Sequence, residues 1–367
     1  MNQPERIVLG TRKGLVELQR AANGWAMAQL SFGGDPVSIT LHDSRDGTDY
    51  AALNLGHFGV KLHRRDAGAS EWTEVAVPTY PEQPPERKDE APWKLNLIWS
   101  LAAGGPNQPG LLWAGTLPGG LFRSADRGAS WQLVQSLWNV PQRAEWAGGG
   151  YDVPGIHSIC VHPQDADALL VGISVGGAWA TRDGGQSWHT SAAGMRACYM
   201  PPERELDQAI QDPHLIARCD GAPDVLWSQH HCGIWRSADG GASWQQRGQG
   251  VPGLPSAFGF TVGVHPTDPD TAWFVPAVAD QNRVPVGHAL CVTRTRDGGA
   301  SFEVLRQGLP QADCYDLIYR HGFAVAPDGR HLAMGSTTGG VWTSADGGDS
   351  WQQLPMRLPP IYSVRFA

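Results

Sequence analysis

Histidines occur at equivalent positions of a repeated pattern in this sequence, and grouped imidazoles suit acid–base or metal chemistry. When the repeats are aligned on their turns, His157, His214 and His321 fall at the same place of the first strand of a repeat. His57 and His231 fall in turns that other repeats fill mostly with small residues. We therefore predict that these five imidazoles face one cavity.

Such a set predicts a site for a divalent metal ion, Zn, Mn, Fe or Ni, with a loop carboxylate such as Asp212 as a further ligand. An ion of this kind polarises a substrate oxygen and activates water, so the first prediction is a hydrolase or lyase for a small polar molecule. Two alternatives stay open: neutral imidazoles that line a polar channel, or metal-free acid–base catalysis.

Two arginines are further candidates for the site. Arg283 belongs to an expanded turn at 280–288, and Arg320 stands between Tyr319 and His321. A guanidinium group binds a carboxylate or phosphate through two parallel hydrogen bonds. We expect Arg283 or Arg320, with Tyr319 beside it, to hold an anionic part of the substrate; the alternative is a solvated loop cation.

Glycoside hydrolysis is a second candidate chemistry, and it requires a pair of carboxyl groups. The available pairs are Glu145 with Asp152 and Glu203 with Asp212, all in long loops. Aromatic residues of these loops could stack on sugar rings: Trp93, Trp138, Trp146, Tyr151 and Tyr199. A third candidate is a non-catalytic binding or assembly module that recognises a peptide or protein partner.

A repeated corner sets the elements that must position these side chains. Residues 237–244 read Ser-Ala-Asp-Gly-Gly-Ala-Ser-Trp: the aspartate can accept from backbone amides, the glycines can adopt positive φ, and the tryptophan begins a strand. Similar corners end at Trp131, Trp188 and Trp351, and weaker copies end at Trp25, Trp72 and Phe302.

The closing aromatic residues are separated by steps of 47, 59, 57, 56, 58 and 49 residues. This spacing predicts an all-β, seven-bladed β-propeller with four strands per blade, formed by residues 1–367 as a single domain. The first blade has no innermost strand of its own. Residues 361–366 have the pattern to supply it and to close the ring by pairing the two ends of the chain.

The corner S/T-x-D-x-G-x-S/T-W resembles the Asp-box (BNR) repeat of sialidases, sortilin-type receptors, xyloglucanases and many bacterial proteins. The resemblance covers nearly the whole chain and implies a propeller of sialidase-like or glycosyl-hydrolase-like type. Its catalytic residues do not transfer, because residues 5–8, Glu-Arg-Ile-Val, differ from the Arg-Ile-Pro segment of sialidases. Xyloglucanases differ too, since they place a cleft between two propellers.

The expected partners are a small polar molecule, a carbohydrate or a protein, and the composition argues against two other classes of partner. The formal net charge of −8 and the absence of a basic run argue against nucleic acid. No apolar run approaches eighteen residues, which argues against a membrane, and the N-terminus lacks a signal-peptide pattern, so the expected location is cytoplasmic. The six cysteines lack C-x-x-C spacing, and most are expected to be small buried side chains.

Overall fold

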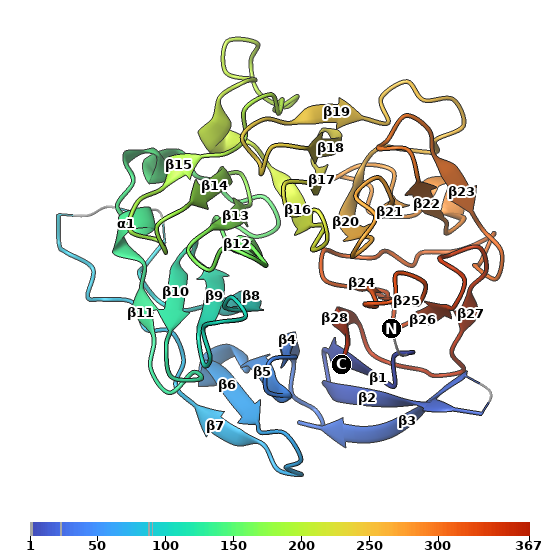
Figure 1. Cartoon of the computed structure of the whole chain (residues 1–367), viewed down its shortest axis with the longest axis horizontal. Helices are drawn as coiled ribbons and strands as arrows, with labels where there is room; N and C mark the ends of the chain where they lie inside the picture. Colours follow the sequence, from blue (N-terminus) through green and yellow to red (C-terminus); the bar gives the residue numbers. More distant parts are fainter. Residues whose placement is uncertain (1–2, 23, 87–88, 90) are drawn as a thin grey trace. The chain divides into compact units, whose positions relative to one another are not determined.

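Seven four-stranded antiparallel sheets make up the computed structural model, which describes residues 3–22, 24–86, 89 and 91–367 (Figure 1). The predicted seven-bladed β-propeller is therefore confirmed. In six of these sheets the hydrogen-bonded neighbours follow in chain order, and in the seventh the C-terminal strand stands beside the first three strands of the chain. Asn23 of the weak first corner and residues 87, 88 and 90 of the Pro-rich loop lie outside the described residues.

Two compact units divide the chain; one boundary, after residue 40, lies within β4 (Val37–Asp43), and another, after residue 213, lies within β16 (Pro213–Arg218). The first unit comprises residues 1–40, 214–240 and 244–367. Its first sheet has the strand order β28 (Ile361–Phe366), β1 (Arg6–Thr11), β2 (Gly14–Ala21) and β3 (Gly24–Ser31). Its second sheet comprises β16 (Pro213–Arg218), β17 (Leu226–His230), β18 (Gly233–Ser237) and β19 (Gln245–Arg247). The other two sheets comprise β20 (Gly259–Val264), β21 (Ala272–Pro276), β22 (Val292–Thr295) and β23 (Glu303–Leu305), and β24 (Phe323–Val325), β25 (Leu332–Gly335), β26 (Val341–Ser344) and β27 (Gln352–Gln353).

The second unit comprises residues 41–213 and 241–243. Its sheets are β4 (Val37–Asp43), β5 (Thr48–Asn54), β6 (Val60–Arg65) and β7 (Thr73–Val75); β8 (Leu97–Ala103), β9 (Leu112–Leu117), β10 (Leu121–Ser124) and β11 (Gln132–Leu133); and β12 (Ile156–Val161), β13 (Leu169–Ile173), β14 (Gly177–Thr181) and β15 (His189–Thr190). Short helical turns lie between strands: α1 (Gln135–Trp138), η1 (Gly56–Phe58), η2 (Pro141–Glu145), η3 (Gln208–Ile210) and η4 (Val286–His288).

The C-terminal strand completes the first blade, as the sequence predicts. β28 pairs antiparallel with β1, and the register sets Val364 opposite Leu9 and Phe366 opposite Ile7. Ile361 and Val364 are fully buried in one apolar cluster with Ile7 and Leu9. The pairing supplies hydrogen-bond partners to an edge of β1 that would otherwise be open.

The corners at 124–130, 181–187, 295–301 and 344–350 are held by hydrogen bonds between their own residues. In the corner at 124–130, the Ser130 amide and hydroxyl both donate to the Asp126 carboxylate, at 2.9 and 2.6 Å. The Gly128 amide donates to the Ser124 hydroxyl at 2.9 Å, and φ is +83° at this glycine. The corner is thus a local structure that the sequence determines by itself.

These hydrogen bonds are made to ionised aspartates, so the stability of the folded protein should depend on pH in the acid range. The Ser187 hydroxyl lowers the pKa of Asp183, and the Ser301 hydroxyl lowers that of Asp297 from 3.8 to about 2. A depressed pKa in the folded state gives stability above the ordinary value, which is lost as the pH falls through the folded-state value. We expect a steady melting temperature between about pH 7 and 5 and a steep fall between about pH 4 and 2.

Thermal unfolding of the parent and of Ser187→Ala and Ser301→Ala, followed by circular dichroism across this pH range, checks the expectation. Both variants should melt lower at pH 7 and show a shallower acid dependence. An acid dependence identical to that of the parent would contradict it.

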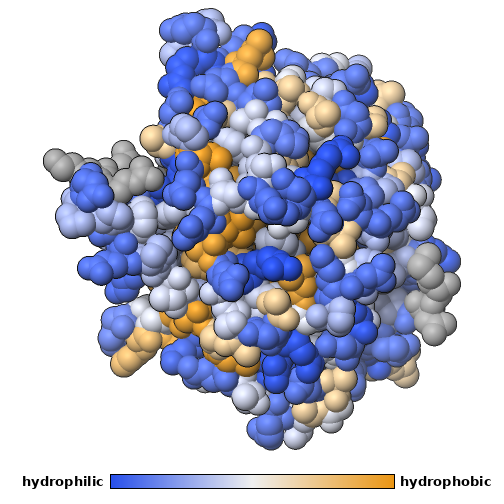
Figure 2. All heavy atoms as spheres, turned by 60° about the vertical axis from the view of Figure 1, so that its left-hand side comes forward, coloured by the Kyte–Doolittle hydropathy of each residue, from blue (hydrophilic) through white to orange (hydrophobic). Residues whose placement is uncertain are grey.

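Large apolar side chains fill the interior of the sheets. Trp113, Trp227, Trp273 and Trp342 are all at most 2% exposed. On the face that Figure 2 shows, hydrophilic residues dominate, and hydrophobic atoms are visible between them in separate areas. Within the described part of the chain, no helix combines the length and apolar character needed to cross a membrane.

Candidate functional site

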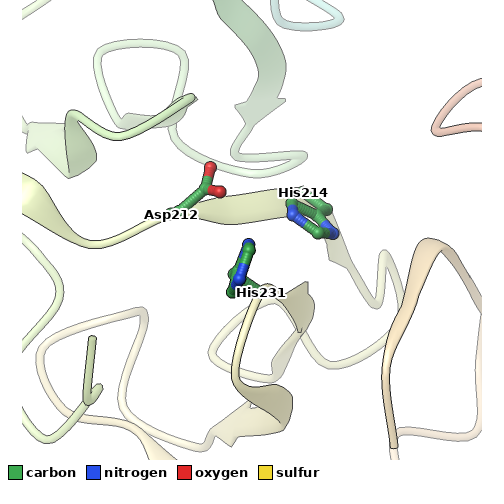
Figure 3. Close-up of side chains that lie close together, drawn as sticks. All are labelled: Asp212, His214 and His231. Carbon is green, nitrogen blue, oxygen red and sulfur yellow. The ribbon is translucent and has the colours of Figure 1, made fainter. Parts of the chain in front are cut away.

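Asp212, His214 and His231 form a compact cluster at the start of the blade that contains β16 to β19 (Figure 3). One possible ligand atom of each residue lies within 4.8 Å of the others. Among the described residues, this is the one group of three or more His, Cys, Asp or Glu side chains close enough to share a metal ion. Asp212 precedes β16 by one residue and His214 is the second residue of that strand. His231 lies in the two-residue turn between β17 and β18.

The His214 ring is fixed by a hydrogen bond and by a stacked ring. Its Nδ1 atom lies 2.6 Å from the carbonyl oxygen of Gly259 in β20. Because a carbonyl can only accept, the neutral imidazole carries its proton on Nδ1 and its lone pair on Nε2. The ring stacks on Phe260 with centroids 4.8 Å apart and an interplanar angle of 11°, and His214 is 2% exposed.

Asp212 is a buried carboxylate with a defined orientation. It is 3% exposed, and its Oδ1 atom accepts from the Val175 amide at 3.2 Å. Burial, and then the charge of Asp212, raise the pKa of Tyr199, whose hydroxyl donates to the Ile210 carbonyl at 2.7 Å. A Cβ atom at Gly149 would lie 3.1 Å from Asp212 Oδ1, so glycine permits the close approach of that loop.

His231 is the most accessible member, being half-buried where the other two are buried. Its ring centroid lies 5.5 Å from that of His214 and 5.7 Å from that of Phe258, both edge to face. The preceding His230 is fully buried and has a structural role, since its Nδ1 atom accepts from the Cys232 amide at 3.0 Å. The hydrogen bond to His230 therefore stabilises the turn, and the His231 side chain belongs to the cluster.

Cys198 and Cys232 are each disulfide-bonded, which the sequence did not indicate because their spacing matches no motif. In this form Cys232 offers neither a nucleophilic thiol nor a thiolate ligand. The other four cysteines are buried thiols outside any disulfide, in agreement with the expectation for most of them: Cys160, Cys219, Cys291 and Cys314.

The remaining predicted histidines are not members of the cluster. His57 is exposed in η1 and its ring lies against Phe58, with centroids 3.8 Å apart. His157 is 1% exposed and its Nδ1 atom lies 2.9 Å from the Ser158 hydroxyl oxygen. His321 is buried just before β24, and its carbonyl accepts from the Val364 amide of β28 at 2.8 Å.

The repeat alignment gave His157, His214, Phe260 and His321 equivalent strand positions, but His321 precedes β24 by two residues and is not in a strand. His157, His214 and Phe260 are each the second residue of an inner strand. The pairing of β12 with β13 shifts between Ile156 and Ser158, so His157 occupies a β-bulge. A bulge redirects a side chain, and it cannot be read from the spacing of corners.

Arg283, Tyr319 and Arg320 gather around Phe260, the ring on which His214 stacks. The Cζ atoms of Arg283 and Arg320 lie 5.6 and 6.0 Å from its centroid, and the Tyr319 ring lies edge-on at 5.1 Å. Arg283 Nη2 donates to Asp280 at 2.6 Å, and its Nη1 lies 3.5 Å from the Tyr319 hydroxyl. Burial opposes ionisation of Arg283, but these bonds outweigh it and raise its pKa.

The carboxylates proposed for glycoside chemistry lie in different surroundings. Glu145 forms an ion pair with Arg204, which also binds Asp207 at 2.8 Å. Asp152 and Glu203 are exposed. Glu145 is exposed as well, so none of these three carboxylates is enclosed by the fold.

Among the loop aromatics, Trp138 and Trp146 are buried, at 3% and 6% exposed, and so serve as packing. Tyr151 and Tyr199 are 51% and 39% exposed and remain accessible to a ligand. Trp93 is half-buried and packs edge-on against Trp138, with centroids 5.2 Å apart.

Two imidazoles and one carboxylate at this separation suit two kinds of chemistry. They can transfer protons to and from a substrate, or they can bind one divalent cation and leave positions for water or substrate oxygen. The aromatic rings of Phe258 and Phe260 limit water on one side of His214. Low local polarity strengthens the electrostatic contacts of such groups.

Comparison with known proteins adds information on the fold. No family model matches the chain. A protein of Neosartorya fischeri described as a probable oligoxyloglucan-reducing end-specific xyloglucanase is 28% identical over 273 residues, which cover 67% of this chain and 31% of that protein. The chain thus spans about a third of the length of this relative.

Solved structures with the same fold include enzymes of glycoside hydrolase family 74. The xyloglucanase of Xanthomonas campestris has a TM-score of 0.57 at 18% identity, covering 87% of this chain and 45% of that one. The enzyme of Niastella koreensis has a TM-score of 0.59 at 13% identity, covering 96% and 54%. A protein of Bacteroides uniformis described as a putative 6-phosphogluconolactonase has a TM-score of 0.59 at 12% identity and full coverage of both chains. At these identities, the chain is similar to all three in its propeller fold.

Proposed function

We propose that this protein is a hydrolase or lyase that acts on a small polar molecule or a carbohydrate at the Asp212–His214–His231 cluster. The observation that carries the proposal is the packing of three groups able to move protons or bind a cation within 4.8 Å, two of them buried. A buried carboxylate is costly to a fold unless it is compensated, so its retention beside two imidazoles favours a chemical role.

Access to the cluster supports the same proposal. His231 is half-buried, so the cluster has a side that solvent or substrate reaches, while Asp212 and His214 are held in fixed orientations. Preorganised groups in a partly enclosed site are the usual basis of catalysis by proteins. A binding module would need contact area rather than this arrangement.

A carbohydrate is the favoured class of polar substrate for two reasons. The xyloglucanase relative and the family 74 neighbours act on carbohydrate according to their descriptions, and the sequence corners resemble the Asp-box repeat of such proteins. In addition, Tyr151 and Tyr199 are accessible aromatic rings in the long loops, suited to stacking on sugar.

A substrate screen tests the proposal. The full chain is incubated with aryl glycosides, xyloglucan oligosaccharides, sugar lactones and uronic acids, each with and without added Zn²⁺ or Mn²⁺, and products are followed by chromatography. Turnover that disappears in Asp212→Asn supports the proposal. Turnover of no compound, or turnover unchanged in that variant, speaks for a binding role or for another site.

The second candidate is a glycoside hydrolase that uses Glu145 and Asp152, and it is favoured by the similarity to xyloglucanases alone. The two mechanisms are separable. The carboxylate pair predicts glycoside cleavage that is insensitive to His231→Ala, whereas the cluster predicts its loss.

Arg283 offers a prediction about the substrate. Its Nη1 atom and the Tyr319 hydroxyl lie 3.5 Å apart beside Phe260, so both can donate to one anionic group. A hydrogen bond to a charged group contributes about 1.5–3 kcal/mol. Arg283→Ala should therefore raise KM for an anionic substrate by about 10-fold or more.

Steady-state kinetics on an acidic and a neutral substrate of the screen check this. Arg283→Lys, which keeps the charge without the planar fork, should fall between parent and Arg283→Ala. Equal effects on both substrates would contradict a specific contact with the anion.

A further inference from the structure

We infer that Asp212, His214 and His231 bind one divalent transition-metal ion. The inference deepens the proposed function and rests on it, because it names the cofactor of the same site. It draws on the separation of the three groups, on the backbone contacts that orient two of them, and on the ligand types.

The separation fits a shared ion. Nitrogen and oxygen ligands bind such ions at about 2.0–2.2 Å, so ligand atoms of one site lie on the order of 3–4 Å apart. The three ligand atoms already lie within 4.8 Å of one another. The upper limit of 4.8 Å is about 1–2 Å longer than the separation in a formed site, and His231, half-buried in a two-residue turn, is the member best placed to move closer.

Contacts behind the ligands orient two of them. The bond from His214 Nδ1 to the Gly259 carbonyl sets the tautomer whose Nε2 carries the lone pair, and Asp212 Oδ1 is held by the Val175 amide. Metal-binding histidines in proteins typically donate their second ring nitrogen to a carbonyl or carboxylate in this way.

The ligand types determine the class of ion. Two imidazoles and one carboxylate favour Zn²⁺, Fe²⁺, Mn²⁺ or Ni²⁺, whereas Mg²⁺ and Ca²⁺ prefer oxygen ligands alone. Three protein ligands leave at least one position for water or a substrate oxygen, as in catalytic sites. When bound, the ion supplies a Lewis acid that polarises a substrate oxygen and lowers the pKa of water.

Metal titration tests the inference without any substrate. The full-length protein is stripped with EDTA, dialysed and titrated with ZnSO₄ by calorimetry, and Co²⁺ is used in parallel for its visible absorption. We expect one Zn²⁺ per chain, no comparable binding of Mg²⁺, and a Zn²⁺-dependent rise in melting temperature. Asp212→Asn and His231→Ala should each weaken Zn²⁺ binding at least about 100-fold.

His57→Ala is the matched control, since it removes an exposed imidazole outside the cluster and should leave Zn²⁺ affinity unchanged. Circular dichroism shows whether each variant is folded; His231→Ala, at a half-buried turn residue, provides the test if Asp212→Asn does not fold. Absence of Zn²⁺ and Co²⁺ binding by the parent, or affinity lost in His57→Ala but kept in His231→Ala, overturns the inference.

The outcomes also separate this inference from the proposed function. Stoichiometric metal without turnover of any screened substrate keeps the metal site and counts against the hydrolase or lyase. Turnover by a protein that binds no metal and is unaffected by EDTA overturns the metal site, and moves the proposed function to acid–base catalysis by the same residues.

Discussion

Deleting residues 361–367 should abolish soluble expression or leave a protein that melts far below the parent. The deletion removes the whole of β28, whose Ile361 and Val364 are fully buried against β1. Burial of a large aliphatic side chain contributes about 1.5–3 kcal/mol, so these two account for a large part of a typical net stability of about 5–15 kcal/mol. The deletion also exposes the edge of β1 and its unpaired backbone groups.

The measurement is the soluble yield together with the melting temperature by circular dichroism. Tyr362→Ala is the matched control, because Tyr362 lies in the same strand but is 37% exposed, and it should shift the melting temperature only slightly. A truncated protein that melts like the parent would show that β28 does not close the blade.

Asp212→Asn should reduce kcat/KM by at least about 100-fold on any substrate that the screen identifies, with the fold retained. The amide keeps the shape of the side chain and can still accept from the Val175 amide, but it loses the negative charge beside His214 and His231. That charge either binds the metal ion or stabilises a protonated imidazole during turnover, so its removal affects both mechanisms.

Glu145→Gln is the control variant for this experiment. Glu145 is exposed, paired with Arg204 and outside the cluster, so its replacement should leave kcat/KM close to that of the parent. The reverse result, with Glu145→Gln inactive and Asp212→Asn active, would place the chemistry at the loop carboxylates.

The corners were predictable because they are local. A Ser or Thr, an Asp, a Gly and a second Ser within seven residues make their hydrogen bonds to one another, as Ser124 to Ser130 do. Their spacing along the chain then gives the number of blades. The place of β28 was predictable for a related reason, since the first blade lacked an inner strand and 361–366 had the matching pattern.

The candidate site was predictable only in part. His214 and His231 were among the predicted ligands, and Asp212 was named as an available carboxylate. The same alignment also predicted His57, His157 and His321 as ligands, because a repeat assigns equivalent positions to every blade. No spacing in the sequence distinguishes one blade from another.

What the sequence alone determined is therefore the architecture, which depends on turns of a few residues repeated at regular intervals. What only the tertiary structure decided is which side chains meet. The His214 tautomer depends on a carbonyl in β20, and His157 lies at a bulge in the pairing of β12 with β13. Such contacts join segments distant in the chain, and a shift of one residue in strand pairing changes the face on which a side chain lies.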